Sequence, residues 1–305
     1  MRIDGFLFFL IVIAVGYFAV RLRLVPDSAA DALSSILLNL CLPAMLLNSF
    51  LRIDPHELLQ AGSATVIVSL IFSLLPFAVS HLLLRGRPGD ERALFRYILS
   101  VGNTSFVCIP LLSLFLNDEQ MLIVIVHGAV MDLLIWGVHH PLFLGSGVGD
   151  RRKRFLKILT SPCLIAVVLG IVLCVCAAEL PSFLSYPLDA LEATVSPLSL
   201  LFIGMLICRY GLLRRPSEKA IAYSLWRVLV YPCVVFASIV WFVPLQTAIL
   251  LAVLFGSPTP ISAVLWCKEY GRDTRAVVDC LIPSTILYFL VFGTLLMCLT
   301  SFGIL

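Results

Sequence analysis

Ten long apolar segments follow one another through this chain of 305 residues, separated by short charged or turn-like stretches. A helix needs about 20 consecutive apolar residues to cross the hydrocarbon core of a bilayer. Hydrophobic residues make up 61% of the chain and charged residues 13%, whereas soluble domains have about 45–50% and about 25%. The pattern therefore predicts an all-α integral membrane protein with ten transmembrane helices. The predicted spans are 5–24, 32–50, 61–84, 93–115, 120–143, 159–179, 187–208, 219–241, 244–266 and 276–300.

Basic residues lie mostly on one side of this predicted topology. Of the 21 Lys and Arg residues, 18 fall in or next to the odd-numbered loops. The other loops and the termini contain only Arg2 and Arg52, and Arg227 falls within the eighth span. Lys and Arg accumulate in the cytoplasmic loops of membrane proteins, so we expect a multi-pass protein of the cell membrane with both termini extracytoplasmic. The 18 residues are Arg21, Arg23, Arg85, Arg87, Arg92, Arg96, Arg151, Arg152, Lys153, Arg154, Lys157, Arg209, Arg214, Arg215, Lys219, Lys268, Arg272 and Arg275.

Several other classes of protein fit the sequence poorly. The net charge of +3 and the lack of a basic tract interleaved with aromatics argue against nucleic-acid binding. The ten cysteines form no C-x-x-C pair and no Cys/His spacing typical of zinc, so we expect no metal site and no cofactor. No G-x-S-x-G, H-E-x-x-H or P-loop motif occurs, so an enzyme is not expected. An intramembrane enzyme or a sensor is the alternative outside transport.

Helix-breaking prolines recur along the chain at a nearly constant spacing. Three pairs of mid-span prolines are 154, 156 and 150 residues apart, close to half the chain length. A repeat of five spans has an odd number of crossings, so the second copy must enter the membrane from the opposite face. We therefore predict two inverted five-helix repeats, over residues 1–150 and 151–305. The proline pairs are Pro43 with Pro197, Pro76 with Pro232, and Pro110 with Pro260.

The stretch NTSFVCIP places polar residues and a proline inside the fourth predicted span. Asn103, Thr104 and Ser105 lie one or two turns before Pro110, which lacks an N–H group and clashes with the carbonyl four residues earlier. Bare backbone groups are tolerated at membrane depth only where protein or a water-filled cavity covers them. The stretch therefore predicts a discontinuous helix beside a substrate site. The structural alternative is a kink that Ser or Thr hydroxyls stabilise.

The stretch FGSPTP shows the same features in the ninth predicted span. Ser257–Pro258 and Thr259–Pro260 each combine an N-cap residue with a proline at the first helical position. A new half-helix can begin at either pair, and its free N–H groups and positive dipole end favour an anion. Two interrupted helices at matching positions of a repeat indicate a transport site. We therefore include these four residues in the predicted substrate site.

A few further polar residues fall within the predicted spans. Asn39 lies one turn before Pro43, and we expect this kink to line the same cavity. Asp132 lies near the middle of span five, where a carboxylate is costly and usually functional. We predict that Asp132 couples transport to a proton or a cation, with His127 as a weaker candidate; the alternative is a protonated Asp132 in a helix–helix hydrogen bond. Arg227 fits either snorkelling to the interface or the binding of an anionic substrate.

Five motifs occur along the chain in a characteristic order. They are LNLCLPAMLLNSF at 38–50, GNTSFVCIPLLSLF at 102–115, SPCLIAVVLGIVL at 161–173, SPLSLLFIGMLI at 196–207 and SPTPISAVLWCKEYGRD at 257–273. Together they resemble the auxin efflux carrier family, which comprises bacterial permeases and the plant PIN proteins and shares its plan with the bile-acid carriers. The likeness extends over nearly the full length.

The resemblance implies a specific architecture. It implies that helices four and nine are broken and cross at the membrane midplane, that spans 1, 2, 6 and 7 form a scaffold, and that spans 3–5 and 8–10 form a moving transport unit. Asn103 and Pro110 match the family's motif in span four, and Pro258 matches the proline of span nine. Relatives often have Asn where this chain has Ser262, so polar contacts at the crossing differ here.

These observations and the resemblance predict a secondary transporter that works by alternating access. The resemblance implies a small organic anion as substrate, such as malate, malonate or indole acetate, and H⁺ or Na⁺ as the coupling ion; a sodium-coupled carrier of the bile-acid type is the alternative. The lipid bilayer is the expected surrounding, and a homodimer is compatible with this interpretation. The predicted substrate-binding residues are Asn39, Asn103, Thr104, Ser105, Pro110, Ser257, Pro258, Thr259, Pro260 and Ser262.

Overall fold

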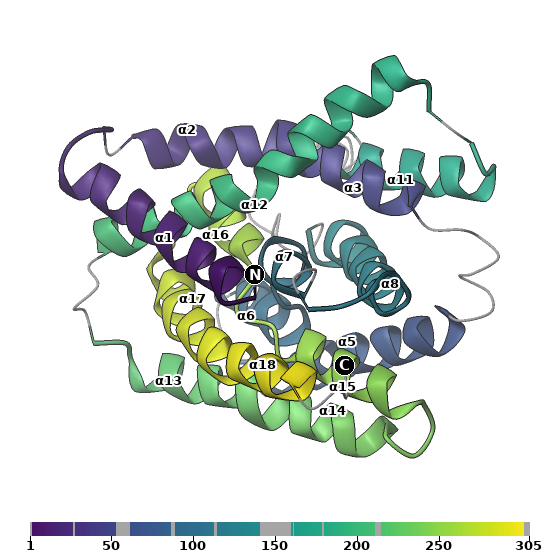
Figure 1. Ribbon diagram of the computed structural model, residues 1–305. Helices are drawn as coiled ribbons and strands as arrows, with labels where there is room; N and C mark the ends of the chain where they lie inside the picture. The colour runs from purple at the N-terminus through teal and green to yellow at the C-terminus, as the bar shows by residue number, and fades with distance from the viewer. Residues whose placement is uncertain are drawn as a thin grey trace.

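The protein is described here from a computed structural model (Figure 1). The structure describes all residues except Met1, Asp27, 53–61, 87–88, 113–114, 141–159, Ser161, Glu179, 211–214 and 302–305. Within these described residues the chain forms helices and connecting turns and contains no strand. The protein is therefore all-α over the part of the chain that can be traced.

Helix occurs in each of the ten ranges that the sequence predicts as spans. The α-helices are α1 (Arg2–Arg21), α2 (Ala29–Ile36), α3 (Leu42–Leu51), α5 (Gly62–Leu83), α6 (Gly89–Ser100), α7 (Ile109–Leu112), α8 (Asp118–Leu134), α11 (Pro162–Val175), α12 (Ser182–Tyr210), α13 (Glu218–Leu225), α14 (Tyr231–Ile239), α15 (Leu245–Phe255), α16 (Ile261–Glu269), α17 (Arg275–Tyr288) and α18 (Thr294–Ser301). The π-helical segments among them are η1 (Leu37–Cys41), η2 (Thr104–Cys108), η3 (Ile135–His139), η4 (Trp226–Val230) and η5 (Phe289–Gly293). Six continuous helical stretches among the described residues are long and apolar enough to cross a membrane, and three shorter apolar helices accompany them.

Helices α1, α2, α3, α11 and α12 pack together and form the upper and left-hand part of the molecule in Figure 1. Helix α1 lies along α12, and α3 packs against both α11 and α12. The contact between α1 and α12 depends on two glycines. A Cβ atom at Gly16 would collide with the carbonyl oxygen of Leu201, and one at Gly204 with that of Ile13. Small residues allow membrane helices to pack backbone against backbone, and this pair does so.

The remaining helices form a second group, which lies below the first in Figure 1. Helix α5 packs against α6 and α8, α15 packs against α14 and α8, and α13 packs against α17. Helix α16 contacts α6 and α17 of this group and also α2 of the first group. An ion pair of 2.6 Å between Lys268 Nζ and Asp31 Oδ1 joins the end of α16 to α2. The two groups also touch where α3 meets α8 and where α12 meets α17 and η2, so α16 is one of several contacts between them.

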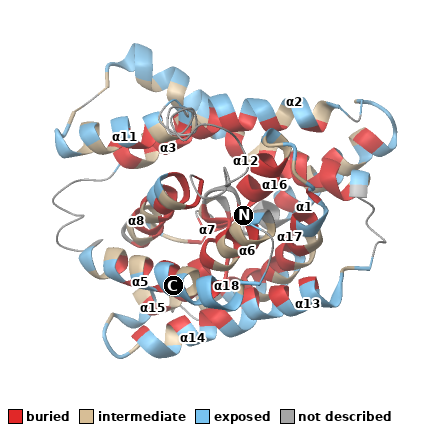
Figure 2. Ribbon diagram, turned by 180° about the vertical axis from the view of Figure 1, so that it is seen from behind, coloured by how far each residue is buried: buried red, intermediate tan, exposed pale blue. Residues whose placement is uncertain are grey.

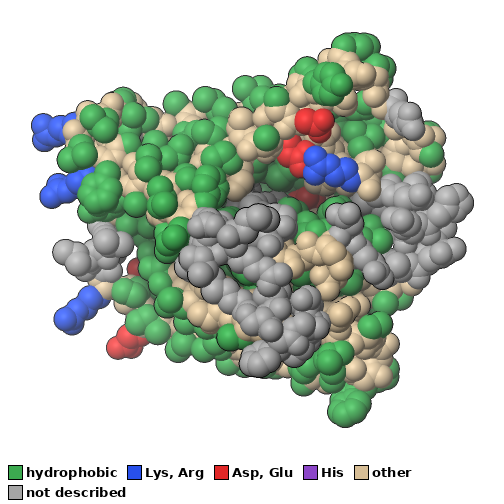
Figure 3. Space-filling view, viewed as in Figure 1, with side chains coloured by type: hydrophobic (Ala, Val, Ile, Leu, Met, Phe, Trp, Pro, Cys, Tyr) green, Lys and Arg blue, Asp and Glu red, His purple; other side chains and the backbone are tan. Residues whose placement is uncertain are grey.

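Large hydrophobic side chains cover much of the outside of the molecule. Figure 2 shows buried residues on the inner faces of the helices and exposed residues on their outer faces. Trp241 and Phe242, in the turn after α14, are 85% and 84% exposed. Among the described side chains in Figure 3, hydrophobic ones are the most widespread, and the few charged ones lie near the edges and in one mixed patch. An apolar surface of this extent is typical of a protein surrounded by lipid.

Most of the π-helical segments adjoin a proline. A proline leaves the carbonyl four residues earlier without its helical partner and presses its ring against that carbonyl, and here this carbonyl lies at the centre of the segment. The wider π turn gives room for such a ring, so Pro43 and Pro232 loosen the helix locally. Four of the five described π-helical segments end two residues before a proline in the sequence, as Cys41 before Pro43, Cys108 before Pro110, His139 before Pro141 and Val230 before Pro232.

Candidate functional site

Two helical regions are interrupted inside the molecule, in the predicted spans four and nine. Helix α6 is separated from η2 by residues 101–103, and α15 is separated from α16 by residues 256–260. The two non-helical segments touch, because the backbone N–H of Asn103 donates a hydrogen bond of 2.9 Å to the carbonyl oxygen of Pro258. The crossing therefore brings together the C-terminal ends of α6 and α15 and the N-terminal ends of η2 and α16.

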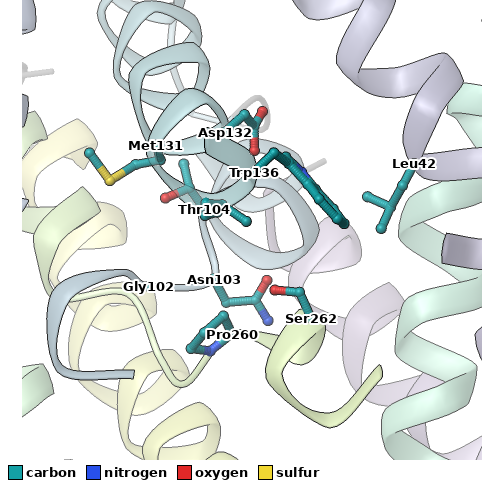
Figure 4. A pocket seen from close by; sticks show the side chains of 10 residues that line it. Leu42, Gly102, Asn103, Thr104, Met131, Asp132, Trp136, Pro260 and Ser262 are labelled. Carbon is teal, nitrogen blue, oxygen red and sulfur yellow. The ribbon is translucent and has the colours of Figure 1, made fainter. Parts of the chain in front are cut away.

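A small cavity lies at this crossing (Figure 4). Its volume is ≈ 20 Å³, which is room for about one water molecule. In Figure 4 the side chains of Asn103 and Ser262 point toward each other on one side of the cavity, and Asp132 lies across from them. The lining residues are Leu42, Gly102, Asn103, Thr104, Met131, Asp132, Ile135, Trp136, Pro260 and Ser262.

Asn103 and Thr104 bring unused hydrogen-bonding groups to this cavity. Their side chains are 2% and 3% exposed, and Asn103 Nδ2, Asn103 Oδ1 and Thr104 Oγ1 have no hydrogen-bond partner among the described residues. No side chain caps the start of η2, and the first turn of a helix leaves its N–H groups without intrahelical acceptors. Because buried polar groups are almost always hydrogen-bonded, this cluster is suited to a polar ligand.

Ser262 and Asp132 complete the polar lining. Ser262 lies in the first turn of α16, and its Oγ is 2.5 Å from the hydroxyl oxygen of Tyr97 on α6. The Tyr97 ring stacks on Trp266 with the ring centroids 4.6 Å apart, which fixes the orientation of the hydroxyl. Asp132 projects from α8 and is only 5% exposed. Asp132 thus lines the same cavity as Asn103 and Thr104 at the start of η2 and as Pro260 and Ser262 at the start of α16.

Ser257 and Thr259 support the crossing from behind and do not line the cavity. Both are completely buried. The backbone N–H of Thr259 donates to Ser284 Oγ at 3.1 Å, and the two hydroxyl oxygens are 3.0 Å apart. The carbonyl oxygen of Ser257 accepts a hydrogen bond of 2.9 Å from Arg227 Nε. The Thr259 side chain and the Ser257 backbone carbonyl therefore fix the non-helical segment, while Ser257 Oγ has no hydrogen-bond partner among the described residues. Pro260 faces the cavity.

Arg227 is buried in the structure and does not snorkel. Its side chain is 1% exposed, and its Nη1 donates to the carbonyl oxygen of Leu99 at 3.2 Å. Arg227 therefore contacts the ends of both interrupted helices, a role that the sequence interpretation did not include. The spacing of Tyr223, Arg227 and Tyr231 indicates that the three share one face of a helix, but it does not identify the partners of Arg227.

His127 and Asn39 lie away from the crossing cavity. His127 is 1% exposed, and its Nδ1 is 2.8 Å from Ser69 Oγ, so it is a packed and hydrogen-bonded residue between α8 and α5. Asn39, in η1, is exposed, and its Nδ2 donates to the carbonyl oxygen of Ser35 at 2.9 Å. It lines two neighbouring cavities, whereas Leu42 is the residue of this helical region that reaches the crossing.

Two predicted site residues can be placed only by their backbone. Ser105 belongs to η2 and Pro110 to α7. Their side chains lie outside the part of the chain that the structure describes. Their position in sequence keeps them on the half-helix that begins at the crossing.

Two larger cavities lie beyond Trp136, with volumes of ≈ 160 Å³ and ≈ 230 Å³. The first is lined by Trp136, Asn39 and Glu269 among others. The second shares Asn39 and Glu269 with it and extends to Asp31 and Lys268. Trp136 lines both the crossing cavity and the first of the larger cavities. Its indole ring therefore stands between the crossing and a wider space at the end of the molecule where α2 begins and α16 ends.

A helical bundle with an apolar outer surface and two interrupted helices that cross is the architecture of a multi-pass membrane transporter. The sequence matches the model of a family described as membrane transport protein, over residues 3–152 and 151–296. The chain belongs to this membrane transport family, which includes the auxin efflux carriers and the PIN-like proteins. A search of curated protein sequences gives no significant match.

Proposed function

We propose that this protein is a secondary transporter of a small organic anion and that the crossing cavity is its substrate site. The observation that carries the proposal is the cluster of unsatisfied polar groups at the start of η2, where Asn103 and Thr104 face the cavity. The N-terminal ends of η2 and α16 both point their dipoles toward this space. A carboxylate there would accept hydrogen bonds from the Asn103 amide, the Thr104 hydroxyl and free backbone N–H groups.

The proposed architecture has ten membrane crossings arranged as two inverted repeats. The helical stretches at all ten predicted ranges, the matching interruptions in spans four and nine and the apolar outer surface support it. We further propose that the group containing α1, α3 and α12 is a scaffold and that the group containing α6, α8 and α15 moves against it. The ion pair between Asp31 and Lys268 would then connect the two in the present conformation.

The size of the crossing cavity supports an alternating-access cycle. A space of ≈ 20 Å³ does not hold a dicarboxylate, so substrate entry requires the walls to separate. Trp136 is the side chain that divides this space from the wider cavities. Its displacement would open a path toward the end of the molecule where the basic loops lie, which the positive-inside distribution predicts to be the cytoplasmic side.

Asp132 fits the role of a proton carrier in this cycle. Its carboxyl group and the substrate carboxylate would share one small cavity, and two like charges at such a distance cannot both remain ionised without a large cost. Binding of the anion would therefore favour protonation of Asp132. Transport would move the anion together with a proton.

Uptake of radiolabelled malonate, malate and indole acetate into proteoliposomes tests the proposal. We expect one of these acids to accumulate when the outside is made more acidic, and to raise the unfolding temperature of the detergent-solubilised protein. Asn103→Ala should strongly reduce both effects while the protein still inserts and stays monodisperse. Absence of flux for every acid, under both proton and sodium gradients, would contradict the proposal. Flux that depends on sodium alone would favour the bile-acid type of coupling.

A further inference from the structure

Arg227 carries a buried positive charge directly behind the crossing. Its guanidinium group donates to the carbonyl oxygens of Ser257 at 2.9 Å and Leu99 at 3.2 Å. It also lies over the ring of Tyr231, 5.5 Å from the ring centroid. A buried charge is costly unless hydrogen bonds or opposite charge compensate it, so these contacts explain how the protein keeps an arginine at this depth.

The two carbonyl acceptors belong to the ends of the two interrupted helices. Leu99 lies in the last turn of α6, and Ser257 follows α15 by two residues. The C-terminal end of a helix carries unpaired carbonyls and a partial negative charge. The Tyr223 hydroxyl donates to the carbonyl oxygen of Ile98 at 2.8 Å and satisfies a further group of α6. Tyr223 and Arg227 lie on one face of span eight. Together they satisfy backbone carbonyls at the C-terminal ends of both α6 and α15.

A ring of backbone carbonyls at helix C-terminal ends is also the kind of site that binds Na⁺ or another hard cation. In this protein the guanidinium of Arg227 already occupies those carbonyls. The charge lies close to the substrate cavity as well, because a Cβ atom at Gly102, which lines the cavity, would collide with Arg227 Nη2. One fixed cation therefore meets two needs: it satisfies the negative helix ends and provides positive potential for an anion in the cavity.

We propose that Arg227 is the resident cation of the crossing and replaces a transported coupling cation, so that transport does not require Na⁺. The inference rests on the proposed anion transport, because it concerns the coupling of that same site. Arg227 acts as a positioning residue, since its contacts are to the backbone of the crossing. Removal of its charge leaves a carbonyl site that a small cation from solution can enter.

Proteoliposome uptake of malonate tests this inference under an inward proton gradient, with external Na⁺ replaced by N-methyl-D-glucamine. We expect wild-type uptake to be equal in both media, and the thermal unfolding of the wild type to be insensitive to Na⁺. Arg227→Gln should lose at least about tenfold in uptake, because hydrogen bonds to charged groups are the stronger ones. Millimolar guanidinium should restore part of this loss, and tetramethylammonium, which cannot donate hydrogen bonds, should not. Arg227→Lys should keep more activity than Arg227→Gln.

Each outcome separates this inference from the proposed function. Wild-type uptake that requires Na⁺ would overturn the inference while leaving anion transport in place. Equal stimulation of Arg227→Gln by guanidinium and tetramethylammonium would also overturn it. If the wild type moves none of the acids, the proposed function fails, and thermal unfolding decides the inference. Stabilisation of Arg227→Gln, and not of the wild type, by millimolar guanidinium would support it, and an equal shift in both proteins would refute it.

Discussion

The backbone N–H of Asn103 donates to the carbonyl oxygen of Pro258 at 2.9 Å, and this single bond joins two helices that are 155 positions apart in the sequence. Both groups are available because each helix has ended: the carbonyl belongs to a non-helical segment, and so does the N–H. The bond leaves the Asn103 side chain free to face the cavity. The crossing is therefore built by backbone, and its chemistry is supplied by side chains.

Replacement of Asn103 by alanine should weaken substrate binding by about tenfold or more, because the cavity loses both a donor and an acceptor. The ligand-induced rise in unfolding temperature with malonate measures the loss. Asn39→Ala is the matched control, since Asn39 lines other cavities and bonds to Ser35 in its own helix. Equal losses in the two variants would show that the binding site extends beyond the crossing.

An alanine at Gly102 should inactivate the protein, because the added Cβ would collide with Ser257 Oγ and with Arg227 Nη2. We expect a destabilisation of about 1–3 kcal/mol, the range for overpacked sites, together with loss of malonate uptake. Gly128→Ala is the control, since its Cβ would lie 3.4 Å from Ile109 Cδ1, an acceptable contact. Wild-type uptake by Gly102→Ala would contradict the tight packing of the crossing.

Because α1 and α12 are in close contact, we expect the stability of the protein to fall when even one methyl group is added between them. Gly16→Ala and Gly204→Ala should each lower the free energy of unfolding by about 1–3 kcal/mol, because each Cβ meets a backbone carbonyl that cannot move aside easily. Gly137→Ala, in η3, has open space around its Cβ and should change stability little. Thermal unfolding in detergent distinguishes these variants. A wild-type unfolding temperature for Gly16→Ala would show that the two helices can separate without cost.

Trp136→Ala should open the crossing cavity to the larger cavity beside it, because the indole ring lines both. Access to the crossing cavity can be measured with a cysteine introduced at Ser262, in a background without the native cysteines. The measured quantity is the rate at which a water-soluble thiosulfonate labels this cysteine. We expect faster labelling in Trp136→Ala than in the Ser262→Cys parent. Trp226→Ala removes a tryptophan that is 42% exposed and should leave the rate unchanged. Unchanged labelling in Trp136→Ala would exclude this path.

The distribution of basic residues predicts which turns face the cytoplasm. A cysteine at Gly86, in the turn after α5, should react with a membrane-impermeant maleimide only after permeabilisation of the cells, because its loop is basic. A cysteine at Phe242, in the turn after α14, should react on intact cells. The reversed pattern would invert the topology and place both termini in the cytoplasm.

The interruption in span nine was predictable from sequence because its cause is local, whereas span four is interrupted at residues 101–103 and not at Pro110, which lies within α7. Pro258 and Pro260 each lack an N–H group, and their positions specify the break within a few residues. The cavity that the Asn39 side chain lines was not predictable in the same way. The π-helical segment before Pro43 changes the helical register, so the face that meets the crossing carries Leu42 and not Asn39.

The contacts of Arg227 could not be predicted because they depend on tertiary structure. Its partners are the backbone carbonyls of Leu99 and Ser257. Every residue type has a backbone carbonyl, so the side chains at those positions do not reveal the contact. Sequence composition therefore contains no complementary charge to signal the pairing. The pairing appears only when helix ends from distant parts of the chain are brought to one place.

The exposed aromatic pair at the α14–α15 turn has a consequence for the depth of the crossing. Trp241 has an amphipathic ring that prefers the level of the lipid headgroups, and α15, with 11 residues, extends about 16 Å from that turn at 1.5 Å per residue. The hydrocarbon layer is about 30 Å thick. With the Trp241 indole at the headgroups, α15 would end near the middle of the bilayer. Membranes of different thickness should then shift the balance of access between the two sides.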